Sequence, residues 1–246
     1  MIGLVIPVYN EETRLNFGYF EEVSDLTGIF LLFVNDGSTD KSEKLIKRFA
    51  ASINNCAYIS LRQNLGKAEA LRYGFHELSS RPNIKYLGFL DSDAAFSVDD
   101  INRISTLINS GHYKTKASNI WWWSSRKKNL NNQINRRLTR HLIGRLLSKI
   151  IQIGFDSLPY DTQSGFKLFQ ATPAFISILE FPMKTKWFID VELLIRFKNI
   201  SGTTLEIKEF ELSKWDDISG SKISFKSVFL ILREVAMVKY IQFSSK

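Results

Sequence analysis

Cysteine, proline and methionine are scarce in this 246-residue sequence, and long apolar runs are missing. The single cysteine, Cys56, excludes an internal disulfide bond and any metal site built from several cysteines. No stretch reaches the roughly 18 consecutive apolar residues of a membrane-spanning helix, because the run over residues 28–34 ends at Asn35. The N-terminus has no signal-peptide pattern, so we expect a cytoplasmic protein, either in solution or at a membrane surface.

Acidic residues are absent from one segment, residues 114–149, and this segment carries the whole positive excess of the protein. It holds ten lysine and arginine residues, whereas the rest of the chain carries 23 basic and 25 acidic residues. The net charge of +8 is therefore local, and it indicates an anionic partner rather than general solubility. The remaining composition, 44% hydrophobic and 24% charged, is that of a globular protein with a sizeable core.

Short apolar runs alternate with helical patterns over the first hundred residues. Four runs bounded by polar residues or glycine predict strands buried on both faces: residues 2–8, 29–34, 57–61 and 86–90. Between them, residues 41–51 and 67–78 place apolar side chains on one side, as amphipathic helices do. This alternation predicts an α/β fold with a mainly parallel central sheet flanked by helices.

The second half of the chain has a different pattern. Strands are predicted over residues 120–124, within 161–170 and over 204–210, and helices over 188–197 and 225–243. The three tryptophans at 121–123 are expected in the core rather than on a stacking surface. Residues 134–151 repeat an apolar residue every fourth position with arginine and lysine between, which predicts a basic amphipathic helix.

Polar clusters follow the predicted strands, at the place where α/β proteins bind their ligands. Asp91 and Asp93 come directly after the run over residues 86–90. Two carboxylates in this D-x-D arrangement can share one divalent cation, and a nucleotide diphosphate can fill its remaining oxygen positions. Such triplets also occur as plain helix caps, so both interpretations stay open.

Two further loops allow two interpretations each. Residues 35–40 fit a tight turn followed by a helix cap, or else Asp36 accepts a hydrogen bond from a base or ribose hydroxyl. Residues 64–67 lack the first glycine and the hydroxyl residue of a P-loop, which excludes an ATPase of that type. Lys67 at a helix start can still contact a phosphate, because lysine and a helix N-terminus both favour anions.

Four motifs taken together are more specific than any one of them: residues 6–11, 34–40, 64–68 and 91–93, in that order. With them the chain resembles the family 2 glycosyltransferases of GT-A fold. Residues 161–169, 187–194 and 220–222 are similar to the branch of dolichyl-phosphate β-glucosyltransferases and dolichyl-phosphate mannose synthases. The resemblance covers nearly all of the chain.

This resemblance implies roles for individual residues. Asp91 and Asp93 would hold Mg²⁺ or Mn²⁺, and Asp161 lies where the branch has its catalytic carboxylate, so Asp161 and Asp93 are the catalytic candidates. The substrate-binding candidates are Pro7, Tyr9, Glu11, Asp36, Lys67, Arg126, Arg137, Arg140, Ser221 and Lys222. The helix around residues 187–194 is expected mainly to pack, with Asp190 and Glu192 as candidates to orient the site.

The implied activity is inverting transfer of a hexose from a nucleotide diphosphate sugar, such as UDP-glucose, to a polyprenyl or dolichyl phosphate. We expect a single domain, with residues 1–110 as its nucleotide-binding half and 111–246 as its acceptor-side half. A phosphate acceptor is already ionised at pH 7, so Asp161 would position groups, whereas a sugar hydroxyl would require Asp161 as a base. The basic helix is expected to bind the anionic cytoplasmic face of a membrane.

Two alternatives remain. One is a soluble glycosyltransferase that acts on a saccharide hydroxyl in cell-surface polysaccharide synthesis. The other is not an enzyme but a nucleic-acid-binding α/β protein, in which the basic segment over residues 114–149 binds phosphates. We favour the membrane surface over nucleic acid, because lipid-phosphate acceptors are found there.

Overall fold

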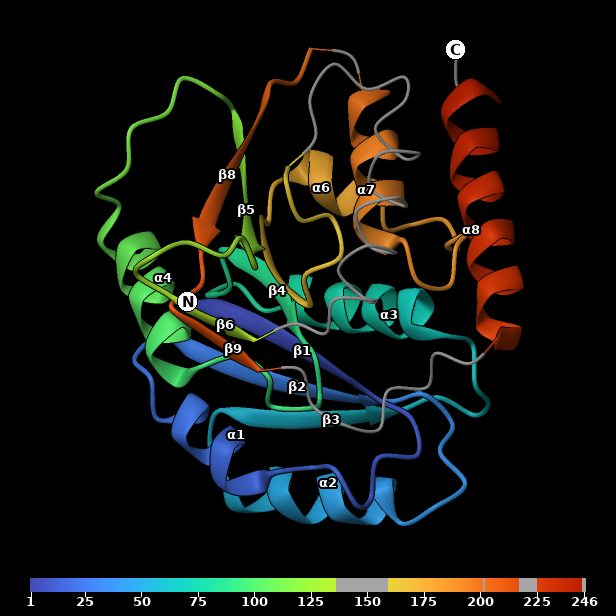
Figure 1. Ribbon diagram of the computed structural model, residues 1–246. Helices are drawn as coiled ribbons and strands as arrows, with labels where there is room; N and C mark the ends of the chain where they lie inside the picture. Colours follow the sequence, from blue (N-terminus) through green and yellow to red (C-terminus); the bar gives the residue numbers. More distant parts are fainter. Residues whose placement is uncertain (136–158, 201, 217–224, 245–246) are drawn as a thin grey trace.

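The apolar runs form strands, and the amphipathic segments between them form helices, in the computed structural model of the chain (Figure 1). The structure describes residues 1–135, 159–200, 202–216 and 225–244, and all structural statements refer to these. The strands of the main sheet are β1 (Ile2–Val8), β2 (Ile29–Asn35), β3 (Cys56–Ser60), β4 (Tyr86–Leu90), β5 (Asn119–Ser125), β7 (Phe166–Gln170) and β8 (Leu205–Glu211). The helices are α1 (Phe17–Ser24), α2 (Ser42–Ser52), α3 (Lys67–Ser79), α4 (Val98–Ser110), α6 (Pro173–Ser177), α7 (Ile189–Lys198) and α8 (Phe225–Ser244).

The order of the strands puts both halves of the chain into one sheet. The seven strands run in the order β3-β2-β1-β4-β7-β5-β8. β1 pairs in parallel with β2 and β4, β2 with β3, and β5 with β8. β7 runs antiparallel to its two neighbours, β4 and β5. The prediction of an α/β fold with a mainly parallel sheet flanked by helices is therefore confirmed.

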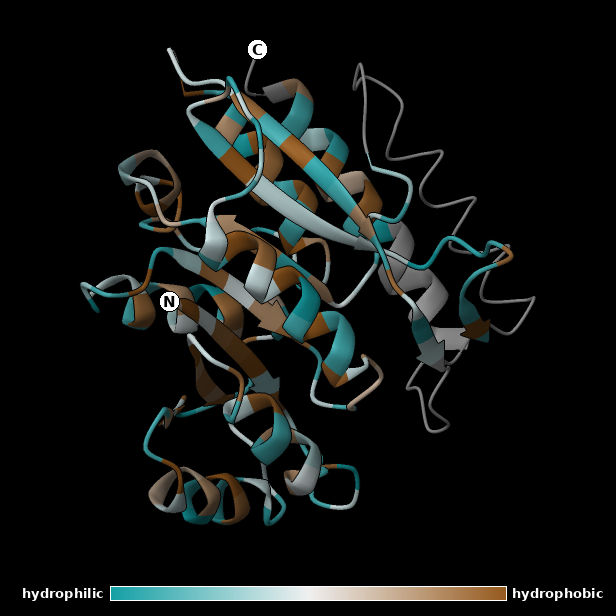
Figure 2. Ribbon diagram, turned by 90° about the vertical axis from the view of Figure 1, so that its left-hand side faces the viewer, coloured by the Kyte–Doolittle hydropathy of each residue, from teal (hydrophilic) through white to brown (hydrophobic). Residues whose placement is uncertain are grey.

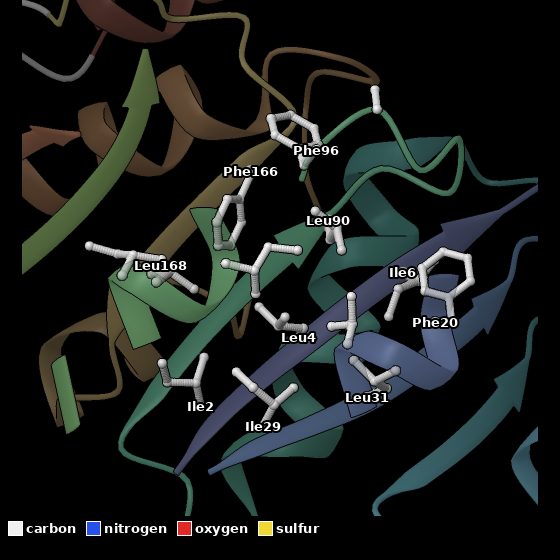
Figure 3. Close-up of a cluster of buried hydrophobic side chains, with 14 of the residues drawn as sticks. Ile2, Leu4, Ile6, Phe20, Ile29, Leu31, Leu90, Phe96, Phe166 and Leu168 are labelled. Carbon is white, nitrogen blue, oxygen red and sulfur yellow. The ribbon is translucent and has the colours of Figure 1, made fainter. Parts of the chain in front are cut away.

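Alternate residues of the central strands face different layers of helices, because successive side chains of a strand point to opposite faces of the sheet. From β1, Leu4 and Ile6 join a core cluster with α1, α2 and α4, whereas Val5 joins a second cluster with α3, α6 and α7. Figure 3 shows part of the first cluster, which joins Phe166 and Leu168 of β7 to side chains of β4, β1 and β2 on one face of the sheet. The helices in Figure 2 alternate hydrophobic and hydrophilic segments, as expected when one face covers the sheet.

The three consecutive tryptophans of β5 divide between these two clusters. Trp122 belongs to the first cluster, and Trp121 and Trp123, both fully buried, belong to the second. The expectation that they are core residues is confirmed.

The C-terminal helix α8 packs against α7 rather than against the sheet. Figure 1 shows the two helices next to each other, and their contact is apolar. It joins Val191 and Ile195 of α7 to Val235, Val238 and Ile241 of α8. None of the helices in the described part of the chain has the length and apolar character needed to cross a membrane.

The prediction of a basic helix over residues 134–151 is wrong at its N-terminal end. Residues Gln133–Asn135 form strand β6, which pairs in parallel with β9 (Lys214–Asp216). Ile134 is buried opposite Trp215. One apolar residue between two polar ones is the alternation of a strand, in which successive side chains point to opposite faces. The remainder of that segment, with Arg137 and Arg140, lies outside the described residues, as do Ser221 and Lys222.

Candidate active site

The strand directions bring loops from both halves of the chain to one edge of the sheet. β1, β2, β4 and β5 all end at this edge, and the antiparallel β7 begins there. Phe166, the first residue of β7, pairs with Leu90, the last residue of β4. Residues 161–165, which precede β7, therefore lie beside the loop that carries Asp91 and Asp93.

Asp91 and Asp93 form the centre of this edge, on the loop that follows β4. The Lys67 ammonium at the start of α3 lies 2.5 Å from Oδ1 of Asp91. The Arg14 guanidinium lies 3.7 Å from Oδ2 of Asp93. Burial and the neighbouring charge of Asp91 raise the pKa of Asp93. Both carboxylates are thus held close together, with cations on their flanks.

This carboxylate pair fits a divalent cation that a nucleotide would help to hold. Burial and the charge of Asp91 both raise the pKa of Asp93, and a cation held by the two carboxylates would offset both effects. No cluster of three or more histidine, cysteine, aspartate or glutamate side chains suited to a metal ion occurs among the described residues. Two carboxylates supply only part of a coordination shell, and diphosphate oxygens and water are the usual complement for Mg²⁺ and Mn²⁺.

Gly165 allows the loop before β7 to approach Asp91 closely. Its carbonyl oxygen accepts a hydrogen bond from the Asp91 N–H at 3.1 Å. A Cβ atom at position 165 would overlap the Asp91 carboxylate, which would then have to move. The backbone of the loop before β7 thus holds the backbone of the other loop at Asp91.

Asp36 organises the loop that leads into α3. Its side chain is 3% exposed and accepts hydrogen bonds from the N–H groups of Leu65 at 2.7 Å and Gly66 at 2.9 Å. The Asn64 amide donates to it at 3.0 Å. Burial raises the pKa of Asp36, and the two backbone N–H groups act in the opposite direction. Asp36 therefore places Lys67, and a contact between Asp36 and a base or ribose stays a prediction.

The loops after β1 and β2 are joined by hydrogen bonds that involve other predicted residues. The Glu11 N–H donates to the Ser42 hydroxyl at 2.8 Å, and the Glu11 carboxylate pairs with Arg14 at 2.9 Å. Arg14, which the sequence did not single out, thus links Glu11 to Asp93. Pro7 lies within β1 opposite Val34 of β2.

Tyr9 follows β1 and is 38% exposed at this edge of the sheet. Its neighbour Asn10 accepts a hydrogen bond from the Thr39 N–H at 2.8 Å. The Asn10 N–H in turn donates to the Ser38 hydroxyl at 3.0 Å. The chain around Tyr9 is therefore tied to the loop after β2.

Arg126 and Asp161, both predicted as site residues, form a buried ion pair. The Arg126 Nε lies 2.7 Å from Oδ2 of Asp161, and its Nη2 lies 2.9 Å from Oδ1. The backbone N–H groups of Arg126 and Gln163 donate to the same carboxylate at 3.1 and 3.2 Å. The guanidinium also lies over the ring of Trp215, 5.0 Å from its centroid. Arg126 and Asp161 therefore act as one unit, in which each fixes the orientation of the other.

Asp190 and Glu192, for which we predicted the same role, have different partners. Asp190 pairs with the fully buried Lys167 of β7. Glu192 pairs with Arg196 at 2.6 Å and accepts N–H groups of Lys184 and Thr185. The sequence does indicate that Lys167 has an anionic partner, because a lysine inside the apolar run of β7 must be buried, and a buried cation requires an anion. The partner itself is not visible in the sequence.

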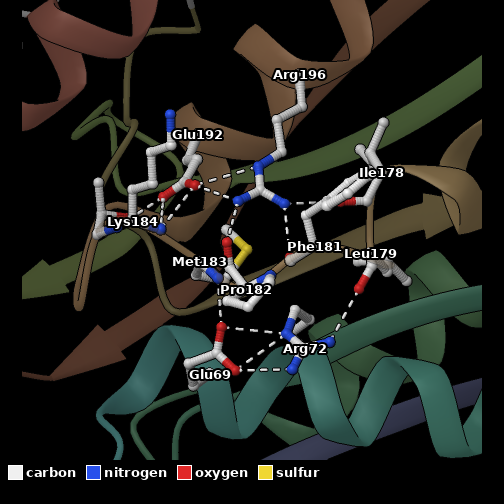
Figure 4. Close-up of polar contacts among 11 residues, drawn as sticks. Glu69, Arg72, Ile178, Leu179, Phe181, Pro182, Met183, Lys184, Glu192 and Arg196 are labelled. Atoms are coloured by element: carbon white, nitrogen blue, oxygen red, sulfur yellow. Dashed lines mark hydrogen bonds and ion pairs between the residues drawn. The ribbon is translucent and has the colours of Figure 1, made fainter.

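Two arginines clamp the segment between α6 and α7, as Figure 4 shows. Arg196 donates to the carbonyl groups of Ile178 and Phe181 at 2.9 and 2.8 Å. Arg72 of α3 pairs with Glu69 and donates to the carbonyl of Leu179 at 3.0 Å. These contacts attach α7 to α3 and belong to the scaffold of the site.

The family of the chain follows from a match that spans more than half of it. The sequence model described as "Glycosyl transferase family 2" matches residues 4–158, and the chain belongs to this family.

Among individual proteins, the chain is similar to a Dolichyl-phosphate beta-glucosyltransferase ALG5A of Trichomonas vaginalis. The two are 25% identical over 246 residues, which cover 96% of this chain and 72% of that protein. The Dolichyl-phosphate beta-glucosyltransferase of Homo sapiens is 27% identical over 241 residues, 90% of this chain and 69% of that protein. The resemblance found in the motifs is thereby confirmed.

Solved structures share the fold at lower identity. Glucosyl-3-phosphoglycerate synthase from Mycobacterium tuberculosis, in complex with Mn²⁺, UDP and phosphoglyceric acid, has a TM-score of 0.60 and 16% identity. The match covers 98% of this chain and 78% of that one. Mannosyltransferase PcManGT from Pyrobaculum calidifontis, in complex with GDP-Man and Mn²⁺, has a TM-score of 0.57 and 13% identity, over 98% of this chain and 64% of that one. These likenesses show the fold.

Proposed function

We propose that this family 2 glycosyltransferase is an inverting enzyme that moves a hexose from a nucleotide diphosphate sugar, such as UDP-glucose, to a polyprenyl or dolichyl phosphate. The observation that carries the proposal is the convergence of three charged groups at one sheet edge. These are the Asp91/Asp93 pair, the Lys67 ammonium on Asp91, and the Arg126–Asp161 unit on the adjoining loops. The names of the dolichyl-phosphate β-glucosyltransferase relatives support the choice of acceptor.

On the donor side, Asp91 and Asp93 would hold Mg²⁺ or Mn²⁺, which would neutralise charge on the departing diphosphate. Lys67, which lies beside Asp91, would add a fixed positive charge near the departing diphosphate. Pro7 lies near the end of β1, and Tyr9 and Glu11 lie on the loop that follows it, next to the Asp36 loop. All three would line the nucleotide pocket. Neighbours that contain Mn²⁺ with UDP or GDP-Man make Mn²⁺ the first metal to test.

On the acceptor side, both oxygens of Asp161 already accept N–H groups from Arg126 and Gln163. This supports a positioning role for Asp161, with Arg126 contacting phosphate, rather than removal of a proton from the acceptor. A phosphate oxygen needs no base because it is ionised at pH 7. Attack on the anomeric carbon from the face opposite the leaving diphosphate then inverts its configuration.

We further propose that the two halves of the chain bind different substrates. We assign nucleotide binding to residues 1–110 and acceptor binding to residues 111–246 of a single domain, whose halves share one sheet. We place the enzyme at the cytoplasmic face of a membrane, held by the basic segment over residues 114–149. Arg137, Arg140, Ser221 and Lys222 are assigned to substrate binding from the sequence alone.

A second candidate acceptor is a saccharide hydroxyl in a cell-surface polymer. It is favoured by 32% identity over 108 residues to the Minor teichoic acid biosynthesis protein GgaA of Bacillus subtilis, a match covering 42% of this chain and 24% of that protein. With this acceptor, Asp161 would have to leave Arg126 in order to accept a proton.

Transfer assays with the full chain test the proposal. Radiolabelled UDP-glucose and GDP-mannose are each incubated with Mn²⁺ and with dolichyl phosphate or undecaprenyl phosphate in anionic vesicles. A parallel series supplies saccharide acceptors in their place. We expect label in the lipid fraction, dependent on metal and abolished in Asp91→Asn. Label in the saccharide fraction alone would support the second candidate.

Vesicle binding is measured separately. Replacement of Arg136, Arg137 and Arg140 by glutamine should weaken sedimentation with anionic vesicles and raise the apparent KM for the lipid phosphate. Donor affinity should stay unchanged, because those residues belong to the acceptor-side half. Full vesicle binding with normal acceptor kinetics would contradict the membrane role of these arginines.

A further inference from the structure

Lys167 is a fully buried lysine in the middle of the sheet. It lies on β7 opposite Phe89 of β4, and its neighbours in the sequence, Phe166 and Leu168, are apolar and buried. Its ammonium lies 4.5 Å from the centroid of the Trp123 ring. Removing a cation from water in this way is costly unless hydrogen bonds and an opposite charge compensate for it.

Two partners provide that compensation. The Lys167 ammonium donates a hydrogen bond to the carbonyl oxygen of Thr162 at 2.9 Å and forms an ion pair with Asp190. Asp190 lies in the first turn of α7, where its other oxygen accepts the Val191 N–H at 2.8 Å. Helix α7 is thereby connected, through two side chains, to the loop that precedes β7.

The residue held by Lys167 directly follows Asp161. Fixing the Thr162 carbonyl fixes the adjoining peptide, from which the Asp161 side chain extends to Arg126. At its other end, the same short loop reaches Gly165, whose carbonyl holds the Asp91 N–H. The lysine thus closes the turn between the acceptor-side ion pair and the donor-side carboxylate.

We propose that Lys167 and Asp190 are positioning residues, which set the placement of the Asp161–Arg126 unit relative to Asp91 and Asp93. The proposal rests on the proposed function, in which that unit contacts the acceptor. Both side chains are buried, so we assign neither a contact with substrate. They act through the Thr162 carbonyl, and a displacement of about 1 Å at a reacting group is enough to slow catalysis by about 100-fold.

Glu192 provides a matched control on the same helix. It is as deeply buried as Asp190, and it is also paired with a cation. Its contacts are with Arg196 and with the N–H groups of Lys184 and Thr185, away from the loop that carries Asp161. Loss of this pair should affect stability without moving Asp161.

The test variant is the neutral double substitution Lys167→Met with Asp190→Asn, which leaves no unpaired buried charge. We expect a folded protein with unchanged affinity for UDP and Mn²⁺. The kcat for transfer to the lipid phosphate should fall by about tenfold, a loss similar to that expected for Asp161→Asn. Glu192→Gln, compared at equal fraction folded, should keep its kcat. If the double variant does not fold, Asp190→Glu, which keeps the charge of Lys167 paired but shifts the carboxylate, should show a smaller loss of kcat in the same direction.

A double-mutant cycle separates positioning from general loosening of the structure. In an Asp161→Asn background the double substitution should have almost no further effect on kcat, because its route of action is already removed. Fully additive losses would overturn the proposal, as would an unchanged kcat in the folded double variant.

Amide hydrogen exchange gives a readout that needs no activity. The N–H groups of Arg126 and Gln163 both donate to Asp161, so they should exchange faster in the double variant and not in Glu192→Gln. Unaltered exchange at both amides would overturn the positioning role. Failure of the wild-type chain to transfer sugar to any acceptor would instead contradict the proposed function, and the exchange result would still decide this inference.

Discussion

The loop of Asp36 and the loop of Asp161 lie at the same edge of the sheet, but different groups stabilise them. Asp36 is bound by the backbone N–H groups of Leu65 and Gly66 and by one amide side chain. Asp161 is bound mainly by the guanidinium of Arg126, and a second buried cation, Lys167, holds the next residue. Both aspartates are almost completely buried.

This difference determines which substitutions each loop tolerates. Backbone N–H donors are present whatever side chain they carry, so the Asp36 loop depends on the aspartate and on the chain path. The Asp161 loop depends on specific charged residues, and removing one leaves its partner buried without compensation. The acceptor side should therefore be the more sensitive to single substitutions of the residues that surround its aspartate.

The largest effect is expected where the two sides meet. Asp91→Asn or Asp93→Asn should lower the Mn²⁺-dependent affinity for UDP by about 100-fold or more. Each variant weakens the hold on the metal ion, whose interaction with the negative diphosphate contributes several kcal/mol. Calorimetry with and without Mn²⁺ measures this. The exposed Asp99 of α4 supplies the control, Asp99→Asn, which should bind normally. Equal Mn²⁺-dependent affinity in all variants would contradict a metal role for the pair.

Gly165→Ala tests the contact between the two sides. The added methyl group would overlap the Asp91 carboxylate, and overpacking of this kind costs about 1–3 kcal/mol. Both the thermal unfolding temperature and the affinity for UDP should fall. Gly18→Ala in α1, where a Cβ meets nothing closer than 3.5 Å, should be neutral or slightly stabilising. A Gly165→Ala protein as stable as wild type would show that Asp91 moves aside without cost.

Asp161→Asn distinguishes the two acceptor classes. With a lipid phosphate we expect a loss of about tenfold through misplacement of Arg126, and a shallow pH dependence, since no proton is removed. With a hydroxyl acceptor the loss should be of general-base size, about 10²–10⁴-fold. Initial rates across pH 5–9 with each acceptor measure the difference. A general-base-sized loss with the phosphate would contradict the positioning role.

The smallest effect is expected at Leu65, whose backbone rather than side chain contacts Asp36. Leu65→Ala keeps the N–H donor, so UDP affinity should stay within about twofold of wild type. Asp36→Asn, which weakens the acceptor for two N–H groups, should lower UDP affinity further than that. A larger effect of Leu65→Ala than of Asp36→Asn would remove the distinction between the two loops.

The parts of the fold that follow local patterns could be predicted from the sequence. The strands over residues 2–8 and 86–90 match β1 and β4, because runs buried on both faces are apolar throughout. Helices α1 and α4 were not predicted, although Asn16 and Ser97 accept N–H groups as their caps. Strand β6 was taken for a helix, because three residues are too few to distinguish the two periods.

The site could be predicted as a set of residues but not as a set of contacts. Asp91, Lys67, Arg126 and Asp161 were all identified from motifs, yet their pairing was not. The Arg126–Asp161 contact joins residues 35 positions apart and depends on the antiparallel pairing of β5 with β7. No periodicity in the sequence encodes which strands become neighbours. The same reason hides the pair formed by Lys167 and Asp190.

The place of β7 between β4 and β5 has a consequence for how the chain folds. Strands β1 to β4 can assemble early in synthesis, but the hydrogen-bonding edge of β4 stays open until residues Phe166–Gln170 have left the ribosome. All five residues of β4 are buried in the finished sheet, and an open apolar edge invites pairing with other chains. A fragment limited to residues 1–110 would carry that edge permanently, so it should aggregate unless β7 is supplied as a separate strand.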